Sequence, residues 1–455
     1  MDILERAGAE GVVEAVEGFL RGRVDDYEIY FSAHRGVNVE SKDGKVDFFK
    51  VKSGAGVGVR TLKASRLGFS FTNVLEKAAL EAMVDSAVEG SGLATADEAL
   101  GFPEPGRGGS GLDAGDLLVY DPSLLELPED EKIGAAVAVE EAARSHDRRI
   151  TKVRSASFSE SVQGHRVVNS KGVDVTHRAT YCSASVMAVA EADGSSEMGW
   201  EVMMGHSMAD VDPRRVGRAA AERAVSMLGA GRIETVRSPA VLENLVALEL
   251  VEALASSVLA DNVCKGRSML AGRLGEKVVS EAVSIRDDGL LRGGWNSSLR
   301  DAEGVARRTT CVIERGVLRS YLYDTYWAGR SGAESTGNAS RSGYGSVPAV
   351  ALSNVYVEAG DLPLDALIAE MGEGLFITEL MGVHTIDRVS GDFSIGAGGF
   401  RVEGGRVGRP VRGMAVAGNL LELFSRVERT GSDLRFMGAV GAPSILLGRI
   451  DASGT

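Results

Sequence analysis

The chain has 455 residues, 44% of them hydrophobic and 25% charged, with a formal net charge of −14 at pH 7. Its length allows roughly two or three domains of ordinary size, and its composition is typical of a soluble globular protein. The negative charge argues against a nucleic-acid-binding protein, because acidic surfaces repel phosphates. The sequence holds no apolar run of about 20 residues, so we expect no membrane span.

The N-terminus and the cysteines predict a cytoplasmic protein. Asp2 and Glu5 lie where a signal peptide needs positive charge, and the apolar residues that follow recur at the spacing of a surface helix. Cys182, Cys264 and Cys311 lie far apart and form no Cys-x-x-Cys pair. This spacing is neither a disulfide framework nor a zinc knuckle, so we expect free thiols in a reducing compartment.

Residues 1–110 are expected to form an N-terminal α+β domain. Alternating apolar residues predict strands from residue 27 onward, and Asp43-Gly44 is a hairpin signal between two of them. Apolar residues in 76–88 form one stripe, which predicts a helix that closes the domain. We interpret residues 90–130 as a connector, because 101–111 within it is rich in glycine and proline and has no periodicity.

Residues 111–232 are expected to form a middle α+β domain with the same order of elements. A helix is predicted over 129–145, and strands follow from residue 152. Ser170-Lys171-Gly172 corresponds to the first hairpin turn, and Asp212-Pro213 predicts the start of a closing helix. This recurrence suggests duplicated N-terminal units; the alternative is two unrelated units with common hairpin chemistry.

Residues 233–455 are expected to form a larger C-terminal β-rich domain. A helix is predicted near 239–260, followed by many short strands and glycine turns. The order of elements along the chain favours an α+β fold of antiparallel β-rich domains with flanking helices over a doubly wound parallel sheet. The most distinctive segment, 378–421, combines short apolar strands with glycine turns such as 390–393, 396–400 and 403–406.

This ordered series of turns resembles the TldD/TldE (PmbA) family of peptide-processing proteins, and the TldE/PmbA branch in particular. Further matching segments are Asp301-Ala302-Glu303-Gly304, Ser335-Thr336-Gly337-Asn338 and Gly441-Ala442-Pro443-Ser444. The likeness is strong over 237–450 and weaker over 20–230. It implies a TldD–TldE heterodimer that cleaves extended peptides inside a closed chamber, with the zinc on the TldD-like partner.

In the TldD branch the zinc helix carries His-Glu-x-x-x-His, and the resemblance aligns this motif with residues 251–256. Val251 and Ser256 stand at the positions of the two histidines, and Glu252 is retained. The segment that corresponds to a third ligand, a cysteine near the C-terminus of TldD proteins, is 434–444, which holds no cysteine, histidine or acid. Because valine has no lone pair and a serine hydroxyl is a poor zinc ligand, we expect no catalytic residue and no metal on this chain. The apolar spacing of 240–260 predicts a core helix with Glu252 exposed.

The same glycine-rich segment supplies the candidates for peptide binding, which are Ser390, Gly391, Asp392 and His384. Glycine-lined strand edges suit an extended peptide that adds as a further strand. The six histidines never occur as His-x-x-His or His-x-x-x-His. His165 and His177 flank a predicted hairpin, where they can approach each other, but two histidines alone do not make a catalytic zinc site.

Two functions stay open. The first is a noncatalytic TldE/PmbA-type subunit of a TldD/TldE metallopeptidase complex in proteolysis and peptide maturation, inactive without its partner. The second is a homodimeric peptide-binding or protein-modulating protein without proteolysis, in line with the older family label, modulator of DNA gyrase. A metal-independent hydrolase has no constellation of residues in its favour.

Overall fold

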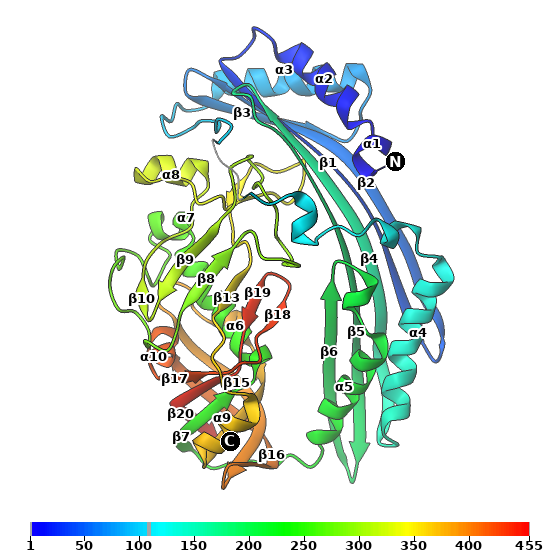
Figure 1. Cartoon of the computed structure of the whole chain (residues 1–455), viewed down its shortest axis with the longest axis vertical. Helices are drawn as coiled ribbons and strands as arrows, with labels where there is room; N and C mark the ends of the chain where they lie inside the picture. Colours follow the sequence, from blue (N-terminus) through cyan, green and yellow to red (C-terminus); the bar gives the residue numbers. More distant parts are fainter. Residues whose placement is uncertain (1, 107–110, 455) are drawn as a thin grey trace.

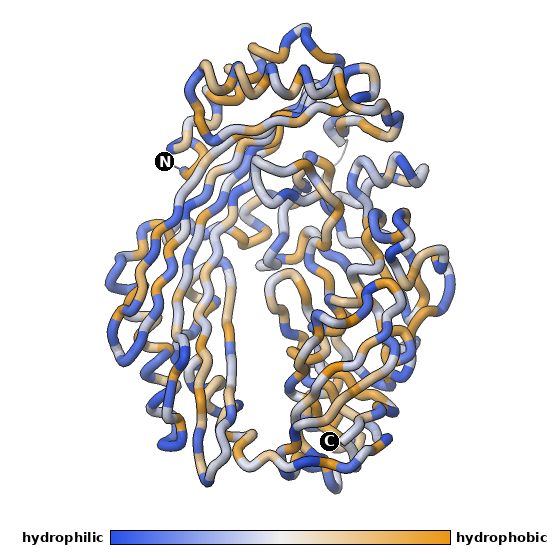
Figure 2. Tube along the Cα trace, turned by 180° about the vertical axis from the view of Figure 1, so that it is seen from behind, coloured by the Kyte–Doolittle hydropathy of each residue, from blue (hydrophilic) through white to orange (hydrophobic). Residues whose placement is uncertain are grey.

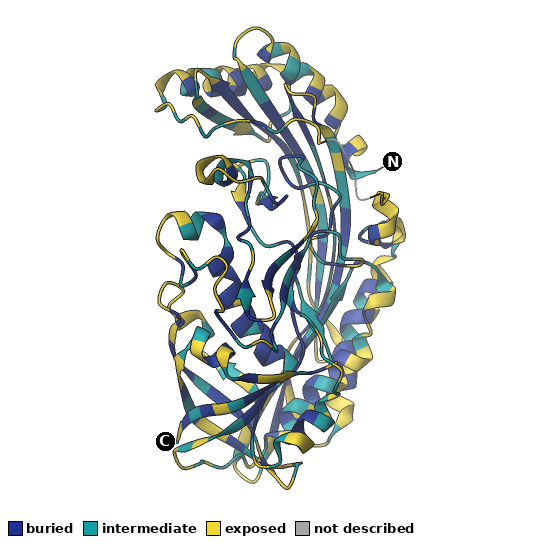
Figure 3. Cartoon of the chain, turned by 60° about the vertical axis from the view of Figure 1, so that its left-hand side comes forward, coloured by how far each residue is buried: buried dark blue, intermediate teal, exposed yellow. Residues whose placement is uncertain are grey.

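The computed structural model describes residues 2–106 and 111–454, so residues 107–110 of the expected connector lie outside the described part of the chain. The molecule has an N-terminal half built on one long curved sheet and a C-terminal half of shorter strands (Figure 1). Helices cover the outer, convex face of the long sheet, and the C-terminal half lies against its concave face (Figure 3). The fold is therefore α+β with antiparallel sheets, as predicted.

The N-terminal half contains two successive units with the order helix, three strands, helix. The first comprises α1 (Ile3–Arg6), α2 (Ala9–Leu20), β1 (Asp26–Lys42), β2 (Lys45–Lys63), β3 (Arg66–Thr72) and α3 (Lys77–Leu93). The second comprises α4 (Glu129–His146), β4 (Ile150–Asn169), β5 (Asp174–Ala192), β6 (Ser195–Gly205) and α5 (Pro213–Ser226). Short 3-10 turns, η1 (Ala114–Leu117), η2 (Pro122–Glu126) and η3 (Met208–Asp210), lie between and within these units.

All six strands form one antiparallel sheet in the order β3-β2-β1-β4-β5-β6. The first strands of the two units, β1 and β4, pair along the middle of the sheet from Glu28 opposite Asn169 to Ser41 opposite Ala156. The strands alternate between hydrophobic and hydrophilic residues, as the tube in Figure 2 shows. This mirror-like strand order is what two joined copies of one unit would produce.

Local turn chemistry explains the hairpins of this sheet. Asp43 and Gly44 connect β1 to β2 with φ values of 54° and 72°, and Lys42 pairs with Lys45 across the turn. Two central residues with positive φ define the tight turn that matches the twist of antiparallel strands. The predicted hairpin at Asp43-Gly44 is therefore confirmed.

Two hydrophobic cores lie between the helices and the convex face of the sheet. One packs α2 and α3 against β1 and β2, and the other packs α4 and α5 against β4 and β5. None of the helices in the described residues is long and apolar enough to cross a membrane.

The C-terminal half contains two further sheets. The first has the order β10-β9-β8-β13-β19-β18, and the second has the order β16-β15-β14-β7-β20-β17, which an additional β16–β20 pairing closes into a barrel. The strands are β7 (Val236–Leu242), β8 (Ile285–Asp288), β9 (Thr309–Glu314), β10 (Val317–Leu318), β13 (Val355–Val357), β14 (Gly374–Met381), β15 (Asp392–Glu403), β16 (Arg406–Asn419), β17 (Val427–Thr430), β18 (Arg435–Met437), β19 (Val440–Ala442) and β20 (Ile445–Gly454), with a small pair β11 (Ala339–Ser340) and β12 (Ala349–Val350). The helices are α6 (Asn244–Ala255), α7 (Ala260–Cys264), α8 (Thr325–Ser331), α9 (Leu364–Met371) and α10 (Leu420–Ser425), with 3-10 turns η4 (Ser256–Val258) and η5 (Val383–Thr385).

The helix expected near 239–260 begins later than predicted. Residues 240–242 belong to β7, where they pair with β14 on one side and with β20 on the other, and α6 begins only at Asn244. A short apolar run fits either a buried strand or a helix, and the long-range pairing of β7 decides the matter. Helix α6 then lies at the centre of the core of the C-terminal half.

Ion pairs join the two halves near β6 and α5. They are Arg412 with Glu197 at 2.6 Å, Arg223 with Glu243 at 2.7 Å, and Arg435 with Glu201. Glu197 and Glu201 lie on β6, so charged contacts hold this edge strand against the C-terminal half.

Candidate functional site

Helix α6 carries the three positions that the resemblance aligns with a zinc motif. Val251 has no exposed surface and packs in the core. Ser256 is also buried, and its Oγ donates a hydrogen bond to the carbonyl oxygen of Ala253 at 2.8 Å. Glu252 is exposed, as expected. The two positions aligned with the histidines do not fit a zinc ion, because Val251 has no donor atom and the Ser256 hydroxyl is bonded to the backbone; the Glu252 carboxylate alone is too few ligands.

The structure places the segment 434–444 beside α6, since β18 and β19 both contact this helix. In this hairpin Phe436 leaves no room for a side chain at position 441, where a Cβ atom would lie 2.7 Å from its ring. Nowhere in residues 2–106 and 111–454 do three His, Cys, Asp or Glu side chains gather in a way that could hold a metal ion.

Sequence reasoning missed a second acid on α6. Glu249 is partly buried, and burial together with the charges of Glu252 and Glu379 raises its pKa to about 7. Burial, with the charge of Glu197, also raises the pKa of Glu379 on β14, against the opposing effect of Arg412. The spacing i, i+3 of Glu249 and Glu252 on a predicted helix was the available signal, because it places both on one face.

The candidate peptide-binding residues lie in and near the turn before β15. Gly391 has a φ of 85°, and a Cβ atom there would lie 3.1 Å from the sulfur of Met269. The Asn419 side chain closes this turn by donating to the carbonyl oxygen of Ser390 at 2.8 Å and to the Asp392 carboxylate at 2.9 Å. The side chains of Ser390, Asp392 and His384 are exposed, and His384 lies in η5, which contacts β15.

Strand β15 runs between β14 and β16 and pairs with both. Its backbone groups are therefore occupied along most of its length, so this strand offers no open edge to a peptide. Of the candidates in the turn, Ser390 and Asp392 are exposed, whereas Gly391 is buried.

A polar cavity of about 360 Å³ lies between the concave face of the long sheet and the C-terminal half. Its walls come from β1, β4 and β5 on one side and from the loops 296–307 and 339–343 on the other. A second cavity of about 430 Å³ adjoins it and shares His165, His177, Arg300 and Asp301 as lining residues.

The predicted approach of His165 and His177 is confirmed. The two residues face each other across β4 and β5 with ring centroids 5.3 Å apart, and His165 stacks on Tyr30. Burial, with the nearby charge of Arg307, lowers the pKa of His177 to about 4. Burial likewise holds the pKa of His165 well below its ordinary value, so both rings are neutral at neutral pH.

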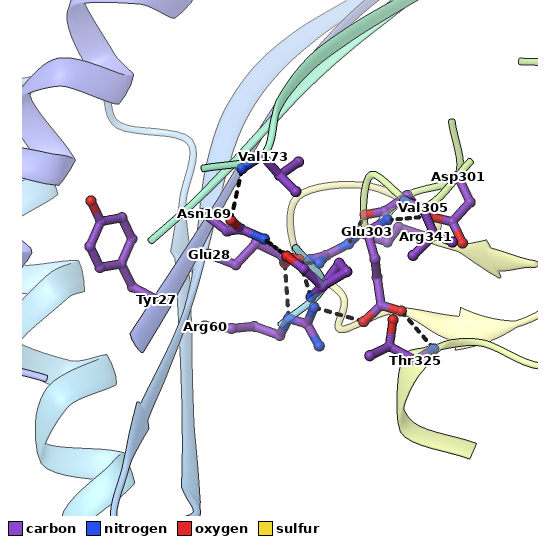
Figure 4. Close-up of polar contacts among 12 residues, drawn as sticks. Tyr27, Glu28, Arg60, Asn169, Val173, Asp301, Glu303, Val305, Thr325 and Arg341 are labelled. Carbon is purple, nitrogen blue, oxygen red and sulfur yellow. Dashed lines mark hydrogen bonds and ion pairs between the residues drawn. The ribbon is translucent and has the colours of Figure 1, made fainter. Parts of the chain in front are cut away.

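A buried charge network beside this cavity joins the halves (Figure 4). Glu28 has no exposed surface; it accepts two hydrogen bonds from Arg60, at 2.9 and 2.7 Å, and pairs with Arg341. Arg60 also pairs with Glu303 of the C-terminal half at 2.9 Å, and Glu303 accepts from the backbone N–H of Thr325 at 3.0 Å. Burial alone would raise the pKa of Glu28, but the two guanidinium groups hold it below its usual range.

Two of the segments that carry the resemblance form this polar interior. Asp301 accepts backbone hydrogen bonds from Glu303 and Val305, both at 2.9 Å, and from Ala339 at 3.0 Å (Figure 4). Burial and the charge of Glu303 raise the pKa of Asp301 to about 7. Asn338 similarly donates to the buried Asp287 at 2.7 Å. Asp301 and Asp287 therefore hold the neighbouring loops in place by accepting hydrogen bonds from them.

Comparison with family models gives a match along most of the chain. The PmbA/TldA metallopeptidase domain 1 matches residues 27–91, the central domain matches 122–228, and the C-terminal domain matches 235–454.

Individual relatives agree with these models. "Metalloprotease PmbA" of Escherichia coli O157:H7 is 29% identical over 447 residues, which span 98% of this chain and 96% of the relative. A "Metalloprotease" of Methanothermobacter thermautotrophicus is 30% identical over 426 residues, or 91% of this chain and 90% of the relative. The solved structure of a putative modulator of a DNA gyrase from Thermotoga maritima superposes with a TM-score of 0.90 at 27% identity, covering 98% of this chain and 100% of that one.

Proposed function

The chain belongs to the PmbA/TldD metallopeptidase family, and from this premise we propose that it is the noncatalytic, TldE/PmbA-type subunit of a two-subunit peptidase. Its partner is a TldD-like metallopeptidase that carries the zinc. The complex cleaves extended peptides in proteolysis and peptide maturation, and this chain helps to enclose and hold the peptide. The free thiols of Cys182, Cys264 and Cys311 support a reducing, cytoplasmic setting.

One observation carries the proposal: the helix and the hairpin that would bind zinc lie side by side, but none of the three aligned ligand positions carries a histidine or cysteine. Val251 packs in the core, the Ser256 hydroxyl is bonded to the backbone, and the neighbouring 434–444 segment has no cysteine, histidine or acid. A catalytic zinc takes about three protein ligands, and Glu252 alone cannot activate a water molecule.

Metal analysis and peptidase assays on the purified full-length chain test this proposal. The isolated chain is expected to hold far less than one zinc ion and to cleave no peptide, because its zinc position has no ligands. Adding a TldD-like partner with an intact His-Glu-x-x-x-His helix is expected to produce chelator-sensitive cleavage above that of the partner alone. Stoichiometric zinc and chelator-sensitive cleavage by the isolated chain would defeat the proposal.

A second candidate function is a homodimer that binds peptides or modulates another protein without proteolysis. The observation in its favour is the likeness to the Thermotoga maritima structure, whose description is a putative modulator of a DNA gyrase. Affinity purification from native cells separates the two candidates. Recovery of a TldD-like partner supports the subunit, and self-association alone supports the homodimer.

A further inference from the structure

The cavity between the long sheet and the C-terminal half has more positive than negative side chains in its walls. Arg300, Arg307 and Arg341 line it, together with one acid, Asp301. The chain as a whole carries a net charge of −14, so this grouping runs against the overall balance. None of the metal-motif or peptide-turn residues lines this cavity.

Arg307 lines the cavity, and the protein satisfies its guanidinium group only in part. Its Nη1 donates to the carbonyl oxygen of Asn296 at 3.1 Å and to the hydroxyl of Ser353 at 2.7 Å. Its Nε is buried and has no partner within the described part of the chain. Burial holds the pKa of Arg307 below its ordinary value, because Asp301 and Asp287 do not fully offset the lost hydration. Burying a cation with too little compensating charge is costly, and an anion bound in the cavity would offset that cost through the charge of the guanidinium group.

The other charged side chains in the cavity walls do not fully compensate the positive charge of Arg307. The Asp301 carboxylate accepts three backbone N–H groups, and no ion pair joins it to Arg307 among the described residues. Arg341 is paired with Glu28 and is not free to bind a ligand. Arg300 lines both cavities, and its guanidinium forms no ion pair with any residue that the structure describes.

The remaining walls suit a small ligand with one charged end. The neutral rings of His165 and His177 and the hydroxyl of Tyr30 offer hydrogen bonds in the polar cavity. The adjoining cavity has an apolar wall that includes Leu117 and Val175. An anionic group beside Arg307 and Arg300 would therefore lie next to a space for an apolar group.

We propose that the polar cavity binds an oxyanion at the end of a small ligand, with Arg307 and Arg300 as its cationic donors. The oxyanion is the C-terminal carboxylate of a peptide or a phosphate group, which share the planar or tetrahedral oxygen acceptors that guanidinium groups recognise. The peptide source rests on the proposed peptidase function, and the phosphate source does not.

Isothermal titration calorimetry on the full-length chain tests the site with three probes. These are inorganic phosphate, the tripeptide acetyl-Gly-Gly-Leu with a free C-terminus, and the same tripeptide with a C-terminal amide. For a peptide ligand, the free acid is expected to bind about tenfold or more tightly than the amide, because the amide lacks the charge. For a phosphate ligand, phosphate binds and the two tripeptides do not.

Substitutions locate the site. Arg307→Gln and Arg300→Gln are each expected to weaken the probe that binds by about tenfold or more, since each removes a charged donor. Arg308→Gln is the matched control, because Arg308 is exposed and absent from the walls of both cavities. Thermal unfolding checks that each variant is folded, and Arg300→Gln carries the test if Arg307→Gln is not.

Two results would overturn the proposal. One is that neither the free acid nor phosphate binds better than the amide. The other is that the Arg300 and Arg307 variants bind as the Arg308 control does. The peptidase proposal is tested separately by zinc content and partner recovery, so failure of this site leaves those results unaffected, and the reverse also holds.

Discussion

Replacing Arg60 by methionine tests whether the buried charge network holds the two halves together. Arg60 is 6% exposed, Glu28 0% and Glu303 1%. Without Arg60, Glu28 keeps its pair with Arg341, but the Glu303 carboxylate keeps, among the residues that the structure describes, only the backbone N–H of Thr325. Leaving a buried charge without its partner costs about 3–5 kcal/mol, so we expect Arg60→Met to lower the free energy of unfolding by that amount.

The assay is urea unfolding followed by intrinsic tryptophan fluorescence, supported by thermal unfolding. Arg23→Met is the matched control, because its ion pair with Asp85 also measures 2.7 Å but its side chains are 38% and 59% exposed. An exposed pair contributes about 0–1 kcal/mol. Methionine retains apolar contact with Phe102, whose ring lies under the Arg60 guanidinium. The double variant Arg60→Met/Glu303→Gln is expected to recover part of the loss, since the uncompensated charge is gone. An Arg60→Met cost no larger than that of the control would refute this account of the network.

Three further predictions concern pH and packing. The pKa of His177 is about 4 in the folded chain and near 6.5 in the unfolded chain. Between these values the unfolded chain binds more protons, so the free energy of unfolding falls as the pH drops from 6.5 to 4. His177→Gln should flatten the dependence of the unfolding midpoint on pH in this range, and an unchanged slope would contradict the lowered pKa. Burial and neighbouring acids raise the pKa of Glu249 to about 7, so its ionisation opposes folding as the pH rises from 4.5 through 7. Glu249→Gln should therefore stabilise the chain at pH 8 but not at pH 4. Equal effects at the two pH values would argue against the raised pKa. A Cβ atom at Gly68 would lie 1.8 Å from the carbonyl oxygen of Ala87, so Gly68→Ala should lower the melting temperature markedly. Gly134 is exposed within α4 and has open space where a Cβ atom would lie, so Gly134→Ala should raise the free energy of unfolding by about 0.5–1 kcal/mol. Similar effects of the two substitutions would refute the role of close packing at Gly68.

Local signals in the sequence predicted much of the fold. The Asp43-Gly44 turn and the helix cap at Asp212 depend on residues close in the chain, and both appear as expected. The approach of His165 and His177 follows from a single hairpin, so it was also predictable. The likeness of the two N-terminal units was visible, but their union in one sheet depends on the β1–β4 pairing between strands more than a hundred residues apart, which no local pattern encodes.

The sites were predictable only in part. The absence of metal ligands at Val251 and Ser256 could be inferred from their chemistry, and α6 is indeed a core helix. The cavity could not be inferred, because Arg307 comes from a loop of the C-terminal half and meets His165 only when that loop packs on the long sheet. Short apolar runs such as 240–242 are ambiguous for the same reason, since tertiary pairing decides between helix and strand.

We propose that this chain contributes no zinc ligands to the peptidase. The most direct measurement is the zinc content and cleavage activity of the full complex when the partner's two motif histidines are replaced by alanine. We expect the complex to assemble, to hold no zinc and to cleave no peptide. A complex that still binds one zinc per pair of subunits and still cleaves peptide would show that this chain supplies the metal site, contrary to what the side chains of α6 predict.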